Sequence, residues 1–222
     1  MKKRKNLITV AIDSPAAAGA GTQAKLISEH YNLFYLDTGK IYRYIGKLKL
    51  YYKKKFTYKL VETKINNLKL SFLKNKNLLS NEVAIAASKI AKEKKIRDIV
   101  HKFQQKCAYQ PPRKYKGSVL DGRDIITVQV KDAMFKFYIT ASIEIRAKRR
   151  FKEYNNLNKK ITYNEVLKSL RNRDKSDKER KYGPLKKTKD SILINTSKLS
   201  KKSSFKKIKA IMDKKLKING NL

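Results

Sequence analysis

Five short apolar runs alternate with helix-like runs along the chain, and this alternation constrains the fold more than any other feature. The apolar runs cover residues 7–13, 33–39, 118–122, 134–140 and 191–196. Helical periodicity covers the residues up to 30, then 41–52, 81–110 with a break near Lys94, 142–154, 162–177 and 205–216. Strands that alternate with helices build a mainly parallel sheet. We therefore predict an α/β fold with helices on both faces of a parallel sheet.

The segment 53–80 interrupts this alternation. It is polar, rich in lysine and asparagine, and poorly periodic. We expect a small insert here, with residues 1–52 and 81–222 forming the core.

Polar side chains follow the first three predicted strands. They are Asp13 with the loop after it, the pair Asp37 and Thr38, and the run from Asp121 to Asp124. Ligands of parallel sheets bind at the carboxyl ends of the strands, so we expect these clusters to converge. A single aspartate at a strand end is more often an ordinary turn or helix cap. Three clusters with charges of both signs favour a site.

The stretch ITVAIDSPAAAGAGTQAKLI, residues 8–27, runs from the first strand through a loop of small residues into a helix. This is the context that a phosphate-binding loop requires, and its N–H groups can cradle an anion. Two positions depart from the pattern, with Ser14 at the first glycine and Ala20 where a lysine should reach the transferring phosphate. Backbone binding can survive this loss, but electrostatic stabilisation of the transferred group should weaken.

The net charge of +38 permits two interpretations. One is a nucleic-acid binder, and the other is a lysine-rich composition that covers every solvated face. The lysines are spread along the chain with few aromatic residues between them, which favours the second interpretation. We expect no specific nucleic-acid partner and no membrane span. The single cysteine, Cys107, suits a reducing cytoplasm.

Three further motifs combine arginines with carboxylates or hydroxyls. LDTGKIYR places Thr38 and Arg43 at a strand-to-helix turn, and LDGRDI places Arg123 beside Asp124. RNRDKSDKERKYGPL spaces Arg173, Asp177 and Arg180 by four and three residues, on one face of a helix or helix end. In so charged a chain, a salt-bridged solvent face is the ordinary alternative for the last run.

Together these stretches resemble the bacterial cytidylate kinase family of P-loop nucleoside monophosphate kinases. The matching segments are AIDSPAAAGAGT, YLDTGKIYR, EVAIAAS, VLDGRDIITV, ASIEIRAKRR and RDKSDKERKYGPL, in the order of that family and over nearly the whole chain. The resemblance implies a P-loop NTPase-type sheet, a monophosphate-binding insert shortened to 53–80, and a basic lid at about 151–172. It also implies phosphorylation of CMP and dCMP by ATP in a monomer, with Mg²⁺ that arrives with ATP and has no directly assigned ligand.

The resemblance also assigns roles to residues. ATP should meet Ser14, Pro15, Ala16, Ala17, Ala18, Gly19, Ala20, Gly21, Thr22, Arg146, Arg149 and Arg150. Arg43, Arg123, Arg173 and Arg180 should be the catalytic residues. The first two and Arg180 should hold the acceptor phosphate and the phosphoryl group in flight, while Arg173, with Asp177, should lie at the sugar and near the transferred phosphate. CMP should meet Thr38, Arg43, Ser88, Arg97, Arg123, Asp124, Asp177 and Arg180. Asp124 would accept from the exocyclic amine of cytosine, while Ser88 and Arg97 would face the ring acceptors.

Four departures keep alternatives open: Ser14, Ala20, the short insert, and Ile126 where the family usually has glycine. The chain could be an active kinase, a catalytically weakened nucleotide-binding relative, or a basic RNA-associated protein on the same scaffold. The acceptor-side arginines and aspartates are all retained, which favours the active enzyme. Lys25, about one turn into the first helix, is a candidate replacement for the missing lysine, although a solvated helix lysine is the commoner case.

Overall fold

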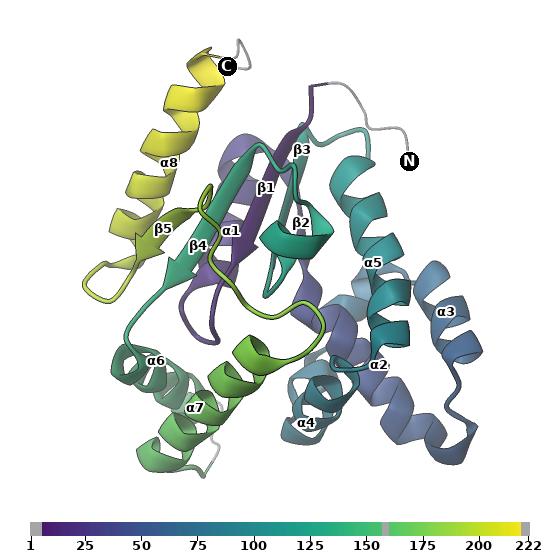
Figure 1. Ribbon diagram of the computed structural model, residues 1–222. Helices are drawn as coiled ribbons and strands as arrows, with labels where there is room; N and C mark the ends of the chain where they lie inside the picture. The colour runs from purple at the N-terminus through teal and green to yellow at the C-terminus, as the bar shows by residue number, and fades with distance from the viewer. Residues whose placement is uncertain (1–5, 157–159, 219–222) are drawn as a thin grey trace.

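The computed structural model describes residues 6–156 and 160–218 (Figure 1). Within these residues five strands form one sheet: β1 (Ile8–Asp13), β2 (Leu33–Asp37), β3 (Gly117–Gly122), β4 (Phe135–Thr140) and β5 (Ile192–Asn195). The strand order is β2-β3-β1-β4-β5, and all neighbours are parallel. The predicted parallel α/β fold is confirmed.

The helices follow the predicted segments closely, except that α3 lies in the segment 53–80, where no helix was predicted. They are α1 (Ala20–Tyr31), α2 (Thr38–Tyr52), α3 (Tyr58–Asn66), α4 (Asn81–Ile90), α5 (Lys94–Tyr109), α6 (Ile143–Asn155), α7 (Tyr163–Glu179) and α8 (Lys201–Ile218). The predicted break near Lys94 is confirmed, since α5 begins at that residue. Helix α2 begins earlier than predicted because the Asp37 carboxylate accepts from the N–H of Lys40 and caps its first turn.

Alternate residues of the central strand β1 enter two different cores. Val10 and Ile12 pack with residues of α1 and α8 on one face of the sheet. Ala11 packs on the other face, with residues of α2, α3 and α5. This alternation is why β1 is buried along its whole length and reads as a continuous apolar run.

The insert 53–80 contains a helix and short 3₁₀ turns, and no strand lies among these residues. Val61 and Ile65, one turn apart on α3, are fully buried in the α2–α5 core together with Leu73 and Leu78. A few apolar residues at helical spacing therefore anchor a segment that is otherwise polar. Its role as a monophosphate-binding domain remains a prediction. The predicted lid spans the end of α6 and the start of α7, and its residues 157–159 lie outside the described part.

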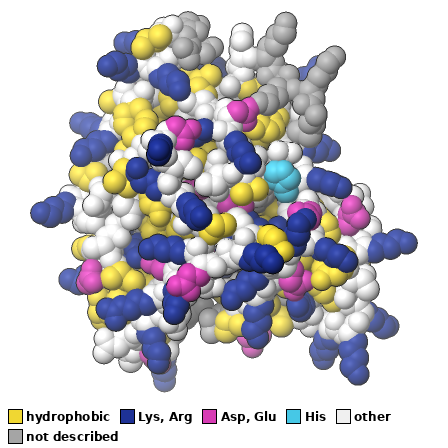
Figure 2. Space-filling model, in the orientation of Figure 1, with side chains coloured by type: hydrophobic (Ala, Val, Ile, Leu, Met, Phe, Trp, Pro, Cys, Tyr) yellow, Lys and Arg dark blue, Asp and Glu magenta, His cyan; other side chains and the backbone are white. Residues whose placement is uncertain are grey.

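Figure 1 shows α2, α4, α6 and α7 gathered at the carboxyl ends of the strands. Lysine and arginine side chains cover the face seen in Figure 2 without gathering into one patch. Among the described residues, no helix combines the length and apolar character needed to cross a membrane.

Candidate functional site

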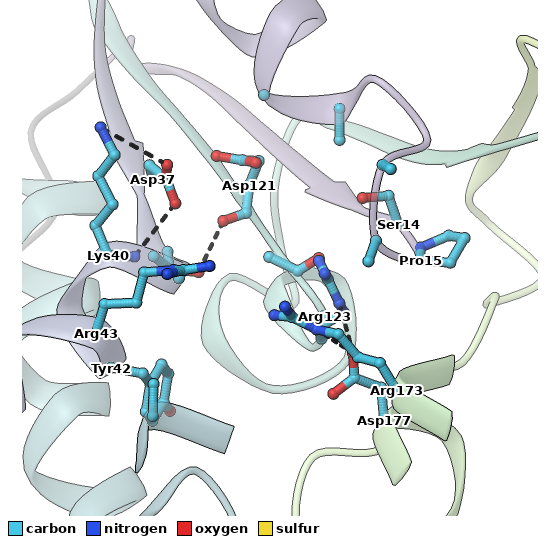
Figure 3. A pocket seen from close by; sticks show the side chains of 18 of the residues that line it. Ser14, Pro15, Asp37, Lys40, Tyr42, Arg43, Asp121, Arg123, Arg173 and Asp177 are labelled. Carbon is cyan, nitrogen blue, oxygen red and sulfur yellow. Dashed lines mark hydrogen bonds and ion pairs between the residues drawn. The ribbon is translucent and has the colours of Figure 1, made fainter. Parts of the chain in front are cut away.

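The carboxyl ends of β1, β2 and β3 open into a cavity of about 490 Å³ (Figure 3). Its walls come from the loop after β1, the start of α2, the turn after β3, and helices α4, α6 and α7. Asp37, Thr38, Asp121 and Asp124 all line it beside the loop. The expectation that the strand-end clusters converge is confirmed.

Asp13 lies beneath this cavity, fully buried at the end of β1. Its two carboxylate oxygens accept from the N–H groups of Ile125 and Ile126 at 2.8 and 3.0 Å. Burial raises the pKa of Asp13 to about 7, against the opposing effect of these hydrogen bonds. Asp13 therefore ties the strand before the loop to the turn after β3.

The loop of residues 14–19 leads into α1 with its N–H groups free of side-chain caps. Gly19 is the N-cap, with φ of 93°, and no side chain caps the helix start. Glycine adopts this left-handed conformation without steric cost. Ala17 is also left-handed, with φ of 60°, at a cost of about 1–2 kcal/mol for a residue with a Cβ. An uncapped helix N-terminus behind a tight loop is a binding site for phosphate.

No cation extends from the position of the missing lysine. Ala20 is the first residue of α1, and its methyl group packs into the core. Lys25 is exposed and lines the cavity, and within the described residues it makes no ion pair. Lys40 also lines the cavity, with Nζ 4.0 Å from the Asp37 carboxylate.

Two of the three arginines predicted to contact ATP from the helix before the lid hold the loop from outside the cavity. Arg146 is buried and donates to the Ala16 carbonyl at 3.2 Å and to Asp174 at 2.6 Å. Arg149 donates to the Ala18 carbonyl at 3.4 Å. Arg150, the third of these arginines, lines the cavity itself. The carbonyls of Ala16 and Ala18 thus point toward guanidinium groups on the outside of the loop. The opposite side of the loop faces the cavity.

Asp37 and Asp121 lie side by side at the cavity wall (Figure 3). Burial, and then the charge of Asp37, raise the pKa of Asp121 to about 7, while the Tyr35 hydroxyl donates to it at 2.9 Å. Among the described residues no three histidines, cysteines or acidic residues cluster as a metal site. Two carboxylates beside a phosphate loop nevertheless fit Mg²⁺, which binds few protein ligands and takes the rest from phosphates and water.

Asp177 on α7 is the centre of an arginine cluster. It accepts from Arg123 Nε at 2.8 Å and lies within 3.8 Å of Arg173 and 3.6 Å of Arg180. Desolvation, followed by the charge of Arg123, lowers the pKa of Arg173 to about 10. Arg43 faces the cluster from α2, and burial and the charge of Arg150 lower its pKa too. So many guanidinium groups around one carboxylate make a site for a polyanion.

Asp124 lies beside this cluster in a buried pocket. Arg97 on α5 donates to its Oδ2, and Arg180 lies 3.7 Å from its Oδ1. The backbone of Gly183, with φ of 57°, covers the Arg97–Asp124 pair so closely that a Cβ atom would meet Arg97 at 2.2 Å. Ser88 reaches the same cavity from α4. A carboxylate, a guanidinium group and a hydroxyl thus meet where a polar ring could bind.

Comparison with known families identifies this arrangement. The family model described as cytidylate kinase matches residues 10–214. The chain belongs to the cytidylate kinase family. Among its relatives are proteins named cytidylate kinase from Thermosipho melanesiensis, 39% identical over 94% of this chain and 98% of the relative, and from Bartonella tribocorum, 42% identical over 88% and 90%. One from Clostridium botulinum is 37% identical over 93% and 98%.

A crystal structure of an uncharacterized protein from Eubacterium ventriosum ATCC 27560 has a similar fold. The TM-score is 0.55 at 18% sequence identity, over 93% of this chain and 98% of that chain. At this identity the likeness concerns the fold alone.

The cavity brings together most of the residues that the cytidylate kinase resemblance had singled out. Residues 14–22 and Arg150 line one part, and Thr38, Arg43, Ser88, Arg123, Asp124, Arg173, Asp177 and Arg180 line the rest. Arg97, Arg146 and Arg149 do not line it. Sequence reasoning missed Lys40, Tyr42 and Lys92, which do. Tyr42 stood inside the quoted stretch YLDTGKIYR, whereas Lys92 had no signal that set it apart from other lysines.

Proposed function

We propose that the chain transfers the γ-phosphate of ATP to CMP, and to dCMP, giving ADP and the nucleoside diphosphate. The observation that carries this proposal is the single cavity shared by a phosphate loop, an arginine cluster and the Asp124 pocket. Membership of the cytidylate kinase family supports the same reaction. The family match does not favour the RNA-associated alternative.

On the ATP side, the uncapped N–H groups of the loop and α1 would hold the β- and γ-phosphates. Thr22, Asp37 and Asp121 would hold Mg²⁺, directly or through water. The metal would neutralise charge on the transferring phosphate. Arg150 already lines the cavity, and Lys25 is a further cation within it. Either can compensate in part for the lysine that Ala20 replaces.

On the acceptor side, Arg43, Arg123 and Arg180 would bind the monophosphate and orient one of its oxygens toward the γ-phosphate. Arg173 would stabilise the group in flight. Phosphoryl transfer needs little covalent chemistry from the protein, so such positioning and charge stabilisation supply most of the catalysis. Asp177 would keep Arg123, Arg173 and Arg180 in place, because its carboxylate lies within 3.8 Å of each of these guanidinium groups.

The base would lie against Asp124. The exocyclic amine of cytosine donates a hydrogen bond to a carboxylate, whereas uracil presents a carbonyl oxygen that the carboxylate repels. Ser88 would donate to a ring acceptor of the base. Arg97 was predicted to do the same, but here it donates to Asp124 and does not line the cavity, so it would act on the base through that carboxylate. We expect the enzyme to act as a monomer in the cytoplasm.

A coupled assay of ADP formation tests the proposal. With ATP and Mg²⁺, ADP should form rapidly when CMP is present and only slowly when it is absent. EDTA should abolish the CMP-dependent rate. The absence of any CMP-dependent ADP formation would refute the proposal and favour the weakened nucleotide-binding relative.

A further inference from the structure

A wide turn after β3 brings together two side chains that are five residues apart. Residues Ile125–Gln129 form a short π-helix. In it the N–H of Gln129 donates to the carbonyl of Asp124 at 3.1 Å, and that of Val130 to Ile125 at 2.8 Å. Hydrogen bonds between residues i and i+5 define this turn, which is frequent at functional sites. The amide Nε2 of Gln129 thereby donates to Asp124 Oδ2 at 2.8 Å.

The other end of the same amide contacts His101. Gln129 Oε1 lies 2.5 Å from His101 Nδ1. Because Nε2 of this amide donates to a carboxylate, Oε1 must accept, and His101 Nδ1 must carry a proton. His101 lies on α5 one turn after Arg97, which donates to Asp124 directly. Helix α5 thus supports the Asp124 carboxylate in two ways. Arg97 donates to it directly, and His101 contacts Gln129, which donates to it in turn.

These contacts distinguish the two oxygens of Asp124. Oδ2 accepts from both Arg97 and Gln129, whereas Oδ1 lies 3.7 Å from the Arg180 guanidinium group. Asp124 lines the cavity, but Gln129 is only 1% exposed and does not. Gln129 can therefore fix the plane of the carboxylate without touching a ligand. Oδ1 remains the oxygen available to a bound base.

We propose that Gln129, itself held by His101, is a positioning residue that orients Asp124 and so sets the preference for cytosine over uracil. This inference rests on the proposed function. A carboxylate held in one plane accepts from the amine of cytosine and meets the O4 carbonyl of uracil with its charge. A carboxylate that is free to rotate loses both the attraction to cytosine and the repulsion of uracil. Discrimination by a polar site requires that the wrong ligand leave the polar groups of the site unpaired.

The test compares kcat/KM for CMP and for UMP in the intact enzyme and in Gln129→Leu. Gln104→Leu is the matched control, since Gln104 is also a glutamine, is also 1% exposed, and its amide is not hydrogen-bonded to Asp124. We expect the CMP-to-UMP ratio to fall about tenfold in Gln129→Leu, the scale of one hydrogen bond to a charged group. The ratio should not change in the control, and kcat at saturating CMP should change far less than the ratio.

Gln129→Leu leaves His101 without a partner, which can destabilise the fold. The double variant His101→Leu with Gln129→Leu removes both partners and leaves no polar group orphaned. It should show the same loss of selectivity. In an Asp124→Asn background, Gln129→Leu should change the ratio no further, because both changes act on one interaction.

The possible outcomes separate the two claims. A CMP-selective wild type whose ratio is retained in folded Gln129→Leu, or in the folded double variant, overturns the positioning role alone. An equal loss of selectivity in Gln104→Leu also overturns it. A wild type without activity on CMP overturns the proposed function and this inference together.

Discussion

The buried carboxylate of Asp13 accepts a hydrogen bond of 2.8 Å from the backbone N–H of Ile125. This contact spans from the end of the central strand to the turn that carries Asp124. It also places a group with a pKa of about 7, against an ordinary value of 3.8, at the base of the cavity.

The shifted pKa of Asp13 predicts a pH dependence of stability. Its folded-state pKa lies above its unfolded value, so between these values the folded state binds the proton more tightly. The resulting stabilisation is complete below about pH 3.8 and is lost as the pH rises through about 7. Relative to Asp13→Asn, which cannot titrate, the wild-type free energy of unfolding should therefore increase as the pH falls from 7.5 toward about 4.5. Urea denaturation across this range measures it, and parallel curves for the two proteins would contradict it.

Restoring the lysine of the phosphate loop should raise activity. In Ala20→Lys, kcat should increase, by at most about 10²–10³ for one electrostatic donor. If Lys25 now supplies that charge, Lys25→Ala should strongly lower kcat in the wild type and matter little beside Ala20→Lys. Single-turnover kinetics with ATP and CMP distinguish these cases. Unchanged activity in Ala20→Lys would mean that Ser14 and left-handed Ala17 have given the loop a shape that excludes the lysine.

The cluster around Asp177 should serve transfer rather than folding. Arg123→Ala and Arg180→Ala should each lower kcat about a hundredfold or more, as the loss of one preorganised donor does. Their Tm should stay nearly unchanged, because removing one of several crowded cations relieves repulsion while Asp177 keeps other partners. Arg171→Ala is the control, because Arg171 lies on α7 with Asp177 but is exposed. Normal kcat in the folded fraction of an unstable variant would make the residue structural.

Truncation of the base-reading carboxylate should affect one substrate more than the other. Asp124→Ala should lower kcat/KM for CMP more than for UMP, because only cytosine loses a hydrogen-bond acceptor. Steady-state kinetics with both nucleotides measure the difference. Equal losses would show that Asp124 does not contact the base.

The buried pair of Arg146 and Asp174 should dominate the stability of the α6–α7 hairpin. Arg146→Met leaves the Asp174 carboxylate buried without its cation, which costs about 3–5 kcal/mol. The double variant Arg146→Met with Asp174→Leu should recover most of that loss, since neither charge remains. Urea denaturation of both variants is the measurement. A double variant as unstable as the single one would show that Arg146 acts through its contact with the Ala16 carbonyl instead.

Much of the fold follows from local sequence. The boundaries of β1, α1, α5 and α7 were predictable because apolar periodicity and polar strand ends coincide there. The convergence of Asp37, Thr38 and Asp124 on one cavity was predictable from a general rule of parallel sheets. Neither inference needed knowledge of side-chain packing.

The support of the site was not predictable in the same way. Gln129 and Asp124 are five residues apart, a spacing that no helix or strand template pairs, and only the π-turn brings them together. Arg146 and Arg149 were predicted at ATP on the strength of their position before the lid. In the structure both arginines donate to carbonyls of the phosphate loop, those of Ala16 and Ala18. Their predicted contact with ATP is untested.

Strand β1 is the middle strand of the sheet and also the first strand along the chain, which affects how the sheet can form during synthesis. Ile8 pairs with Gly117, and Val10 with Phe135, so the middle strand of the sheet is the first one made and the one that waits longest for its first neighbour. At about 5–20 residues per second, a ribosome takes on the order of 5–20 seconds to cross that gap. Throughout it, the apolar segment ITVAI lacks both flanking strands. The most buried strand of the finished enzyme is thus the one that the nascent chain must shield the longest from premature association.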